Sequence, residues 1–191
     1  MSTRRLARVA ATASALAAVL VCASAQATVV VALSRPDMVR RADMIVRASV
    51  LGHTSRWNED HSQIITLTDL RVTRWIKGNA TTSVLVLRQL GGTVGDTRSH
   101  IAGDPQLAQG QDVVLFLRRG EGVVYLYAMA QSAFHVERSH SGALRVQRDL
   151  DGLTFAVRDG DQLRLVEPSA EPGESLDSFL ADLASLVAGA R

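Results

Sequence analysis

Cysteine, lysine and aromatic residues are scarce in this chain of 191 residues, which has one Cys, one Lys and 4% aromatic residues. The single cysteine, Cys22, lies in an N-terminal segment that we expect to be removed. The remaining chain then has no thiol, which excludes disulfides, Cys-ligated zinc and a Cys nucleophile. The fractions of hydrophobic residues (47%) and charged residues (21%) exclude intrinsic disorder and collagen-like repeats. The length predicts a single domain with a modest core.

The N-terminal segment has the pattern of a secretory signal peptide. Three arginines precede an uncharged apolar stretch over residues 9–23, and Ala25-Gln26-Ala27 has the A-x-A form that signal peptidases cleave. The stretch is too short and too rich in Ala to span a membrane comfortably, so we expect no membrane span after cleavage. The pattern therefore predicts a cleaved signal peptide over 1–27, with Thr28 as the new N-terminus.

The chain that follows the signal has a nearly balanced charge. Residues 1–27 hold three of the 21 basic residues and none of the 19 acidic ones, so residues 28–191 carry 18 basic and 19 acidic side chains. No stripe of basic residues with interleaved aromatics is present, and we expect no nucleic acid as a partner. The bias toward Arg and Ala is typical of a high-GC bacterium, in which an exported protein is periplasmic or extracellular. A lipid anchor on Cys22 and twin-arginine export through Arg4-Arg5 are the alternatives.

Hydrophobic periodicity predicts a mainly β protein with a helix near each end. Ser34, Pro36 and Asp37 predict the start of a short helix that ends near Arg41 or Ala42. The predicted strands cover, in order, residues 44–51, 63–76, 83–90, 113–117, 123–130, 134–138, 144–148, 153–158 and 162–167.

Two of these strands, and two of the segments that connect strands, have distinctive patterns. In 63–76 the inward face changes parity near Asp69, which predicts a bulge or bend of the kind that small closed barrels need. Residues 113–117 are continuously apolar, as in a strand that is buried on both faces. Residues 53–61 predict a polar turn, and residues 91–110 predict a long loop.

Three apolar segments resemble netrin-like domains, the group that includes the tissue inhibitors of metalloproteinases. Residues 37–50 resemble their short helix and first strand, residues 70–78 resemble the next strand with its Lys-Gly turn, and residues 111–117 resemble a later strand. The chain is also similar to a group of secreted bacterial proteins with the same spacing, which share a segment like Asp151-Gly152-Leu153. The resemblance covers residues 37–130 and implies an OB-type barrel.

We therefore expect an OB-like five-stranded barrel over 28–138 with a short N-terminal helix, a β-hairpin extension over 139–167, and an amphipathic C-terminal helix over 175–188 that Ser175 caps. The resemblance also implies inhibition of a metalloproteinase, whose zinc the family inhibitors chelate through an N-terminal Cys. This chain departs from that pattern, because Thr28 offers a hydroxyl in place of sulfur.

No short catalytic motif is present. The sequence contains no G-x-S-x-G, H-E-x-x-H, phosphate-binding Gly loop or dinucleotide fingerprint, and we expect neither an enzyme nor a cofactor. A hydrolase with dispersed residues is one alternative, since triads assemble from distant positions. A second is a periplasmic metal-binding protein in which His53, His61 and Glu59 hold zinc or copper, although a solvated turn is the simpler interpretation. A metal pocket at His135 and Glu137 is a further alternative.

The leading interpretation is a secreted, non-enzymatic interaction module that binds a secreted or periplasmic protein, as a protease inhibitor does. The N-terminal edge at Thr28 and the loop over 91–110 are expected to carry the contact, because loops beside a barrel mouth often bind ligands. The loop candidates are Gly91, Gly92, Arg98 and His100. Arg71 and Trp75 share a strand parity and would stack as a weak anion-binding or sugar-binding surface, with a solvated sheet face as the simpler interpretation.

Overall fold

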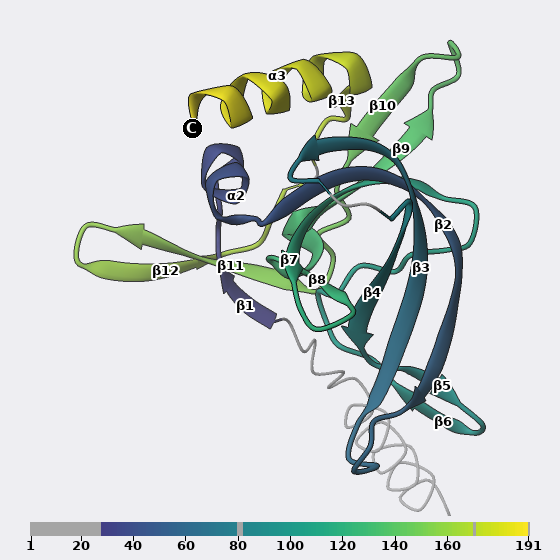
Figure 1. Cartoon of the computed structure of the whole chain (residues 1–191). Coiled ribbons are helices and arrows are strands. Elements are labelled where there is room, and N and C mark those ends of the chain that lie inside the picture. Colours follow the sequence, from purple (N-terminus) through teal and green to yellow (C-terminus); the bar gives the residue numbers. More distant parts are fainter. Residues whose placement is uncertain (1–27, 80–81, 170, 191) are drawn as a thin grey trace, which may run out of the picture.

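The computed structural model of the protein describes residues 28–79, 82–169 and 171–190. The predicted signal peptide over 1–27 lies outside these residues. In Figure 1 the barrel strands occupy one side of the molecule, helix α3 (Leu176–Gly189) lies across the top, and a hairpin projects away from the barrel. Among the described residues, no helix is both long enough and apolar enough to cross a membrane.

Five strands close into the barrel that the sequence predicts. They are β2 (Met44–Trp57), β3 (Ile64–Lys77), β4 (Val84–Leu90), β7 (Asp112–Arg119) and β8 (Val124–Leu126). Their spatial order is β7-β2-β3-β4-β8, and β8 pairs with β7 to close the ring. β4 and β8 run parallel, whereas all other neighbours in the ring are antiparallel. Counted along the chain, the third and fifth barrel strands are therefore neighbours, as in an OB-type barrel, and the predicted fold class is confirmed.

β7 lies between two hydrophobic cores. All residues from 113 to 117 are 0% exposed. The barrel core contains Val113, Leu115 and Leu117, while Val114 and Phe116 belong to a second core under α3 and α2 (Arg35–Arg41). Side chains alternate across a strand, so this continuous apolar run is buried on both faces, as predicted.

The irregularity predicted near Asp69 is present in the pairing of β2 with β3, but the extra residue is Leu51 of β2. The inward face of β3 itself does not change at Asp69, because Thr68 and Leu70, on either side of it, are both buried. A bulge of β3 lies farther along, at Thr73, which is skipped in the pairing between the two strands. Beyond this bulge Trp75 packs against the same core as Val72, because the extra residue reverses the alternation.

A second layer continues the barrel sheet beyond β7. Its strands are β9 (Ala133–Arg138), β10 (Leu144–Gln147) and β13 (Glu174–Ser175), and the pairing of β9 with β10 confirms a predicted hairpin. The N-terminus of α2 is capped as predicted, since Ser34 Oγ accepts a hydrogen bond from the Asp37 backbone N–H at 3.2 Å. Ser175 occupies the N-cap position of α3, but its side chain makes no capping hydrogen bond.

A separate sheet of three strands joins the start of the described chain to the projecting hairpin. β1 (Thr28–Val31) pairs in parallel with β11 (Leu153–Asp159), and β12 (Gln162–Val166) pairs with the other edge of β11. The predicted hairpin of β11 with β12 is confirmed. The extension expected over 139–167 is divided between two sheets, because β10 joins the barrel sheet and β11–β12 joins β1.

Three local predictions are corrected. Residues 53–57 do not form a turn but continue β2, where they pair with β3. Several of their side chains are exposed, so the alternation of apolar and polar residues that indicates a strand is missing there. The strand expected over 123–130 ends at Leu126, and a 3-10 helix, η2 (Met129–Ser132), follows. The loop over 91–110 contains a short hairpin of β5 (Gly92–Val94) and β6 (Thr97–Ser99).

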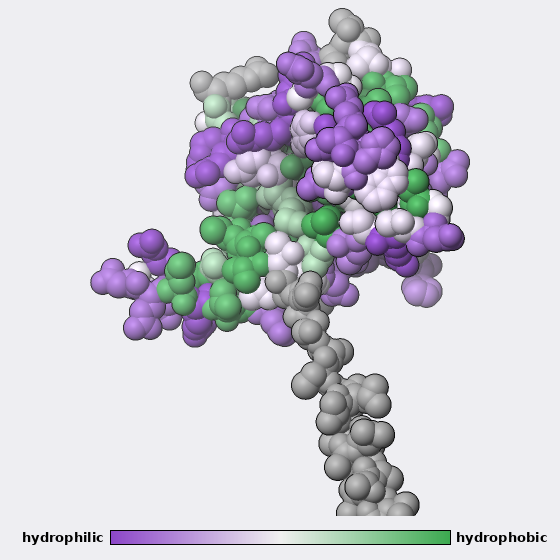
Figure 2. Space-filling model, turned by 90° about the horizontal axis from the view of Figure 1, so that it is seen from below, coloured by the Kyte–Doolittle hydropathy of each residue, from purple (hydrophilic) through white to green (hydrophobic). Residues whose placement is uncertain are grey.

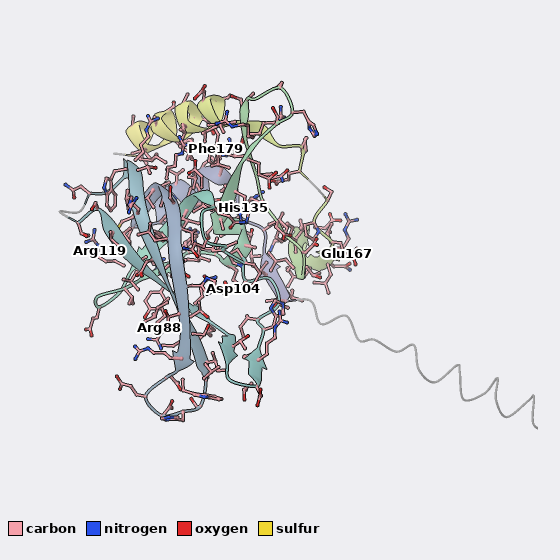
Figure 3. The ribbon with its side chains drawn as sticks, turned by 90° about the vertical axis from the view of Figure 1, so that its right-hand side faces the viewer. Arg88, Asp104, Arg119, His135, Glu167 and Phe179 are labelled. Carbon is pink, nitrogen blue, oxygen red and sulfur yellow. The ribbon has the colours of Figure 1, made fainter. Side chains whose placement is uncertain are left out.

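Phe179 attaches α3 to the sheet and gives a test of the second core. Its side chain, labelled in Figure 3, is 0% exposed, and its ring centroid lies 4.6 Å from that of Phe134. We expect Phe179→Ala to lower the free energy of unfolding by about 3 to 5 kcal/mol, because it leaves a cavity. Urea unfolding followed by circular dichroism measures this change. Leu165→Ala, at a position on β12 that is 61% exposed, is the control, and similar losses in both variants would contradict the assigned packing.

Candidate binding site at the end of the barrel

Five of the predicted site residues line one pocket at an end of the barrel. This barrel-end pocket has a volume of about 490 Å³ and lies between β2, β3, β4 and the segment that follows β4. The predicted residues in its lining are His53, Gly91, Gly92, Arg98 and His100. His53 belongs to β2 and the other four to the 91–110 segment, so the fold brings together two separate parts of the sequence.

Gly91 and Gly92 bring the 91–110 segment onto the barrel. Gly92 has a φ of 130°, and a Cβ there would lie 2.3 Å from Ser55 Oγ and 2.4 Å from Thr66 Oγ1. These hydroxyls are hydrogen-bonded at 2.8 Å, and Thr66 Oγ1 donates to the Gly91 carbonyl oxygen at 2.7 Å. Only glycine permits so close an approach in this conformation. The two glycines therefore position the wall of the pocket.

Asp104 is the acidic residue in the described lining of the pocket, and its side chain lies beside the barrel strands (Figure 3). Gln89 Nε2 donates to Asp104 Oδ2 at 3.0 Å and to the Pro105 carbonyl oxygen at 3.0 Å, which holds this segment against β4. Burial raises the pKa of Asp104 to about 6, and the hydrogen bond from Gln89 and the nearby charge of His100 oppose that rise. In the sequence Asp104 is one polar loop residue among several, and its burial depends on contacts that no local pattern encodes.

Thr28 contacts the 91–110 segment, but its polar groups are engaged within the fold. Its hydroxyl donates to the Ala102 carbonyl oxygen at 2.6 Å, and its backbone N–H donates to the Gly152 carbonyl oxygen at 2.8 Å. The N-terminal edge and the 91–110 segment, which the sequence predicts to bind a partner together, are therefore joined by the hydrogen bond from Thr28 to Ala102. The groups of Thr28 serve the structure here, in contrast to the zinc-chelating N-terminus that the netrin-like resemblance implies.

The expected metal ligands His53, Glu59 and His61 do not meet. His53 lines the barrel-end pocket, whereas Glu59 lines a different depression near the β2–β3 turn. The His61 ring stacks on Trp57 with 6.5 Å between the ring centroids. His53 precedes Trp57 on the same strand by about 13 Å, at roughly 3.3 Å per residue. Among the described residues, no group of three or more His, Cys, Asp or Glu side chains could hold a metal ion.

Arg71 and Trp75 lie on opposite faces of β3. The side chain of Arg71 is exposed, whereas Trp75 packs against the barrel core. The bulge at Thr73 reverses the parity between them, so the shared face expected for an unbroken strand does not exist. The stacked pair that would form an anion-binding or sugar-binding surface is therefore not formed.

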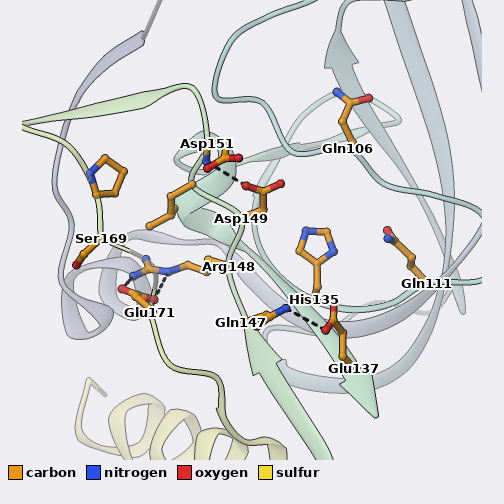
Figure 4. A pocket seen from close by; sticks show the side chains of 12 residues that line it. Gln106, Gln111, His135, Glu137, Gln147, Arg148, Asp149, Asp151, Ser169 and Glu171 are labelled. Atoms are coloured by element: carbon orange, nitrogen blue, oxygen red, sulfur yellow. Dashed lines mark hydrogen bonds and ion pairs between the residues drawn. The ribbon is translucent and has the colours of Figure 1, made fainter. Parts of the chain in front are cut away.

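A second pocket, of about 550 Å³, lies beside β9 and β10 (Figure 4). Gln147 Nε2 donates to Glu137 Oε2 at 2.9 Å, and Arg148 Nε donates to Glu171 Oε2 at 2.9 Å. Burial lowers the pKa of His135, and the neighbouring carboxylates oppose this effect. Two carboxylates of this pocket are therefore already held by neighbouring side chains.

Exposed apolar side chains concentrate on the three-stranded sheet. Among the described residues, this sheet carries five of the eight large hydrophobic side chains that are exposed: Val29, Val31, Val157, Leu163 and Leu165. The strand register places four of them on one side, which we call the apolar sheet face: Val29, Val31, Leu163 and Leu165. Val30 and Phe155, on the opposite side, pack against the body of the protein. Figure 2 shows apolar side chains gathered over this sheet.

A comparison with protein-family models and with curated proteins finds no match to this chain. The netrin-like resemblance therefore stays a prediction. Over the described residues, the structure defines a mainly β protein with a closed barrel of five strands, two α-helices and additional strands outside the barrel.

We expect Asp104→Asn to stabilise the protein at pH 7.5 by about 1 to 2 kcal/mol. The folded-state pKa of about 6 lies above the ordinary value for Asp, so the stability present at low pH is lost as the pH rises from about 4 through 6. The full shift corresponds to roughly 3 kcal/mol, which partial access to solvent reduces. The Asn side chain keeps an oxygen that accepts from Gln89.

Urea unfolding of both proteins at pH 7.5 and pH 4 measures this difference. The extra stability of the Asn variant should fall by more than half at pH 4, where Asp104 is protonated in the folded protein. An Asn variant less stable than the unmodified protein at pH 7.5 would contradict the destabilisation that is assigned to the half-buried carboxylate.

Proposed function

We propose that the protein is a secreted or periplasmic, non-enzymatic module that binds another protein. The observation that carries this proposal is the apolar sheet face, whose four aliphatic side chains are between 54% and 70% exposed. Covering apolar surface releases roughly 25 cal/mol per Å², and contiguous apolar patches mark interaction sites. The predicted signal peptide and the resemblance to netrin-like domains support the same function.

The proposed occupant is an extended segment of the partner with apolar residues at alternate positions. β1 and β12 are the edge strands of the sheet, so about half of their backbone N–H and C=O groups are directed away from it. A segment that pairs with β12 would gain main-chain hydrogen bonds and place every second side chain beside Leu163 and Leu165. Arg158 lies opposite Leu163 on the same face, which favours an acidic residue in that segment.

The N-terminal edge and the 91–110 segment both contribute to this surface. Val29 and Val31 come from the edge predicted to bind, and they extend the apolar sheet face beyond the hairpin. The 91–110 segment supports the sheet from behind, since a Cβ at Gly103 would lie 2.2 Å from Leu153 Cδ2. Its role in the proposal is therefore to hold β1 and β11 in position.

Replacing both Leu163 and Leu165 by Glu should weaken partner binding at least tenfold, because two charges would have to be buried in the contact. The immobilised protein is used to capture binding proteins from the secreted fraction of its own host, and each captured protein is then purified and its Kd measured. Val84→Glu is the matched control, because Val84 is an exposed apolar residue on a different sheet. This control should change the Kd less than twofold.

The free energy of unfolding of both variants should lie within about 0.5 kcal/mol of that of the unmodified protein, since all the changed positions are exposed. Equal partner binding by the Leu163/Leu165 variant would contradict the proposal. Self-association through this face, or binding to phosphatidylglycerol vesicles in place of a protein, would contradict it as well.

A further inference from the structure

We propose that the barrel-end pocket binds a small organic cation that carries N–H donors, a primary ammonium or a guanidinium, against the Asp104 carboxylate. The pocket volume of about 490 Å³ lies within the range typical of small-molecule sites. The pocket and the apolar sheet face share no residue, so this proposal and the proposed protein-binding function can fail independently.

The charges around the pocket favour a cation. Its titratable and charged groups are His53 on β2, Arg98 on β6, and His100 and Asp104 in the segment after β6. Arg98 is exposed, so water and salt screen its charge. The Asp104 side chain is half-buried, and Asp104 is the one acidic residue among the described residues of the lining. A cation that enters the pocket therefore places a full counter-charge beside this carboxylate.

The hydrogen-bonding groups favour a cation with several N–H donors. Asp104 Oδ2 accepts from Gln89, whereas Oδ1 accepts from no described residue. Every buried side-chain nitrogen or oxygen in the described part of the chain has a partner, so the Oδ1 atom is open to solvent. An ammonium has three donors and a guanidinium has five. The open Oδ1 atom is thus matched to such a ligand.

The same lining argues against a quaternary ammonium. Such ligands are recognised by the faces of aromatic rings, and no Phe, Tyr or Trp belongs to the lining of the barrel-end pocket in the described residues. Trp57, four residues after His53 on β2, lines a different depression. Recognition in this pocket therefore depends on N–H donors.

Agmatine, which carries one primary ammonium and one guanidinium, is the probe for this site. In an NMR titration of the ¹⁵N-labelled protein at pH 7.5, agmatine should produce saturable shifts of the Gly92 and Asp104 backbone amide signals. Methyl glucoside and acetate, a neutral polyol and an anion, should produce none. Lowering the pH to 5 should weaken agmatine binding about tenfold, because about one Asp104 carboxylate in ten is then ionised.

Two Asp→Asn variants separate a local contact from a general effect of charge. Asp104→Asn should weaken agmatine binding at least tenfold. Asp96→Asn removes the same charge from the exposed turn between β5 and β6, and it should change the affinity less than twofold. Absence of saturable shifts with agmatine, equal binding by Asp104→Asn, or binding of methyl glucoside or acetate at the same amides would overturn the proposal.

Discussion

Residues 113–117 have water on neither side, because the barrel core covers one face of β7 and the second core covers the other. This single strand pairs with β2, β8 and β9, so it belongs to the barrel and to the layer under α3 at once. The residues just before β7 are fixed as well. Gly110 N–H donates to the Val50 carbonyl oxygen, and Val50 N–H donates to that of Gln111, each at 2.9 Å. With Gly91 and Gly92 held against β3, the 91–110 segment is anchored at both ends.

The sequence predicts those parts of the fold that depend on local alternation. The buried run over 113–117, the hairpins and the C-terminal helix all follow from periodicity and turn residues, and the structure confirms them. The remaining features of the fold depend on contacts between segments that are distant in the sequence. The parallel pairing of β1 with β11 leaves no local signal, and the bulge at Thr73 separates Arg71 from Trp75 although their spacing predicts a shared face. The 91–110 side of the candidate pocket is recognisable in the sequence as a glycine-rich loop, but the partial burial of Asp104 is not.

The two proposed surfaces come largely from parts of the chain that closure of the barrel does not require. The apolar sheet face comes from β1 and the β11–β12 hairpin, and the barrel-end pocket comes largely from the connection between β4 and β7. They adjoin where the Thr28 hydroxyl donates to Ala102 and where Gly103 packs on Leu153. The barrel therefore supports two different surfaces, an apolar sheet face and a polar pocket.

The protein-binding function is tested most directly by photo-crosslinking in the host cell. A photoreactive amino acid in place of Leu163 reports contact at the apolar sheet face without purification of a partner. The proposed function predicts one dominant adduct with another exported protein, and no such adduct when the same amino acid replaces Val84. Adducts with a second copy of this chain alone, or the same adducts from both positions, would contradict it.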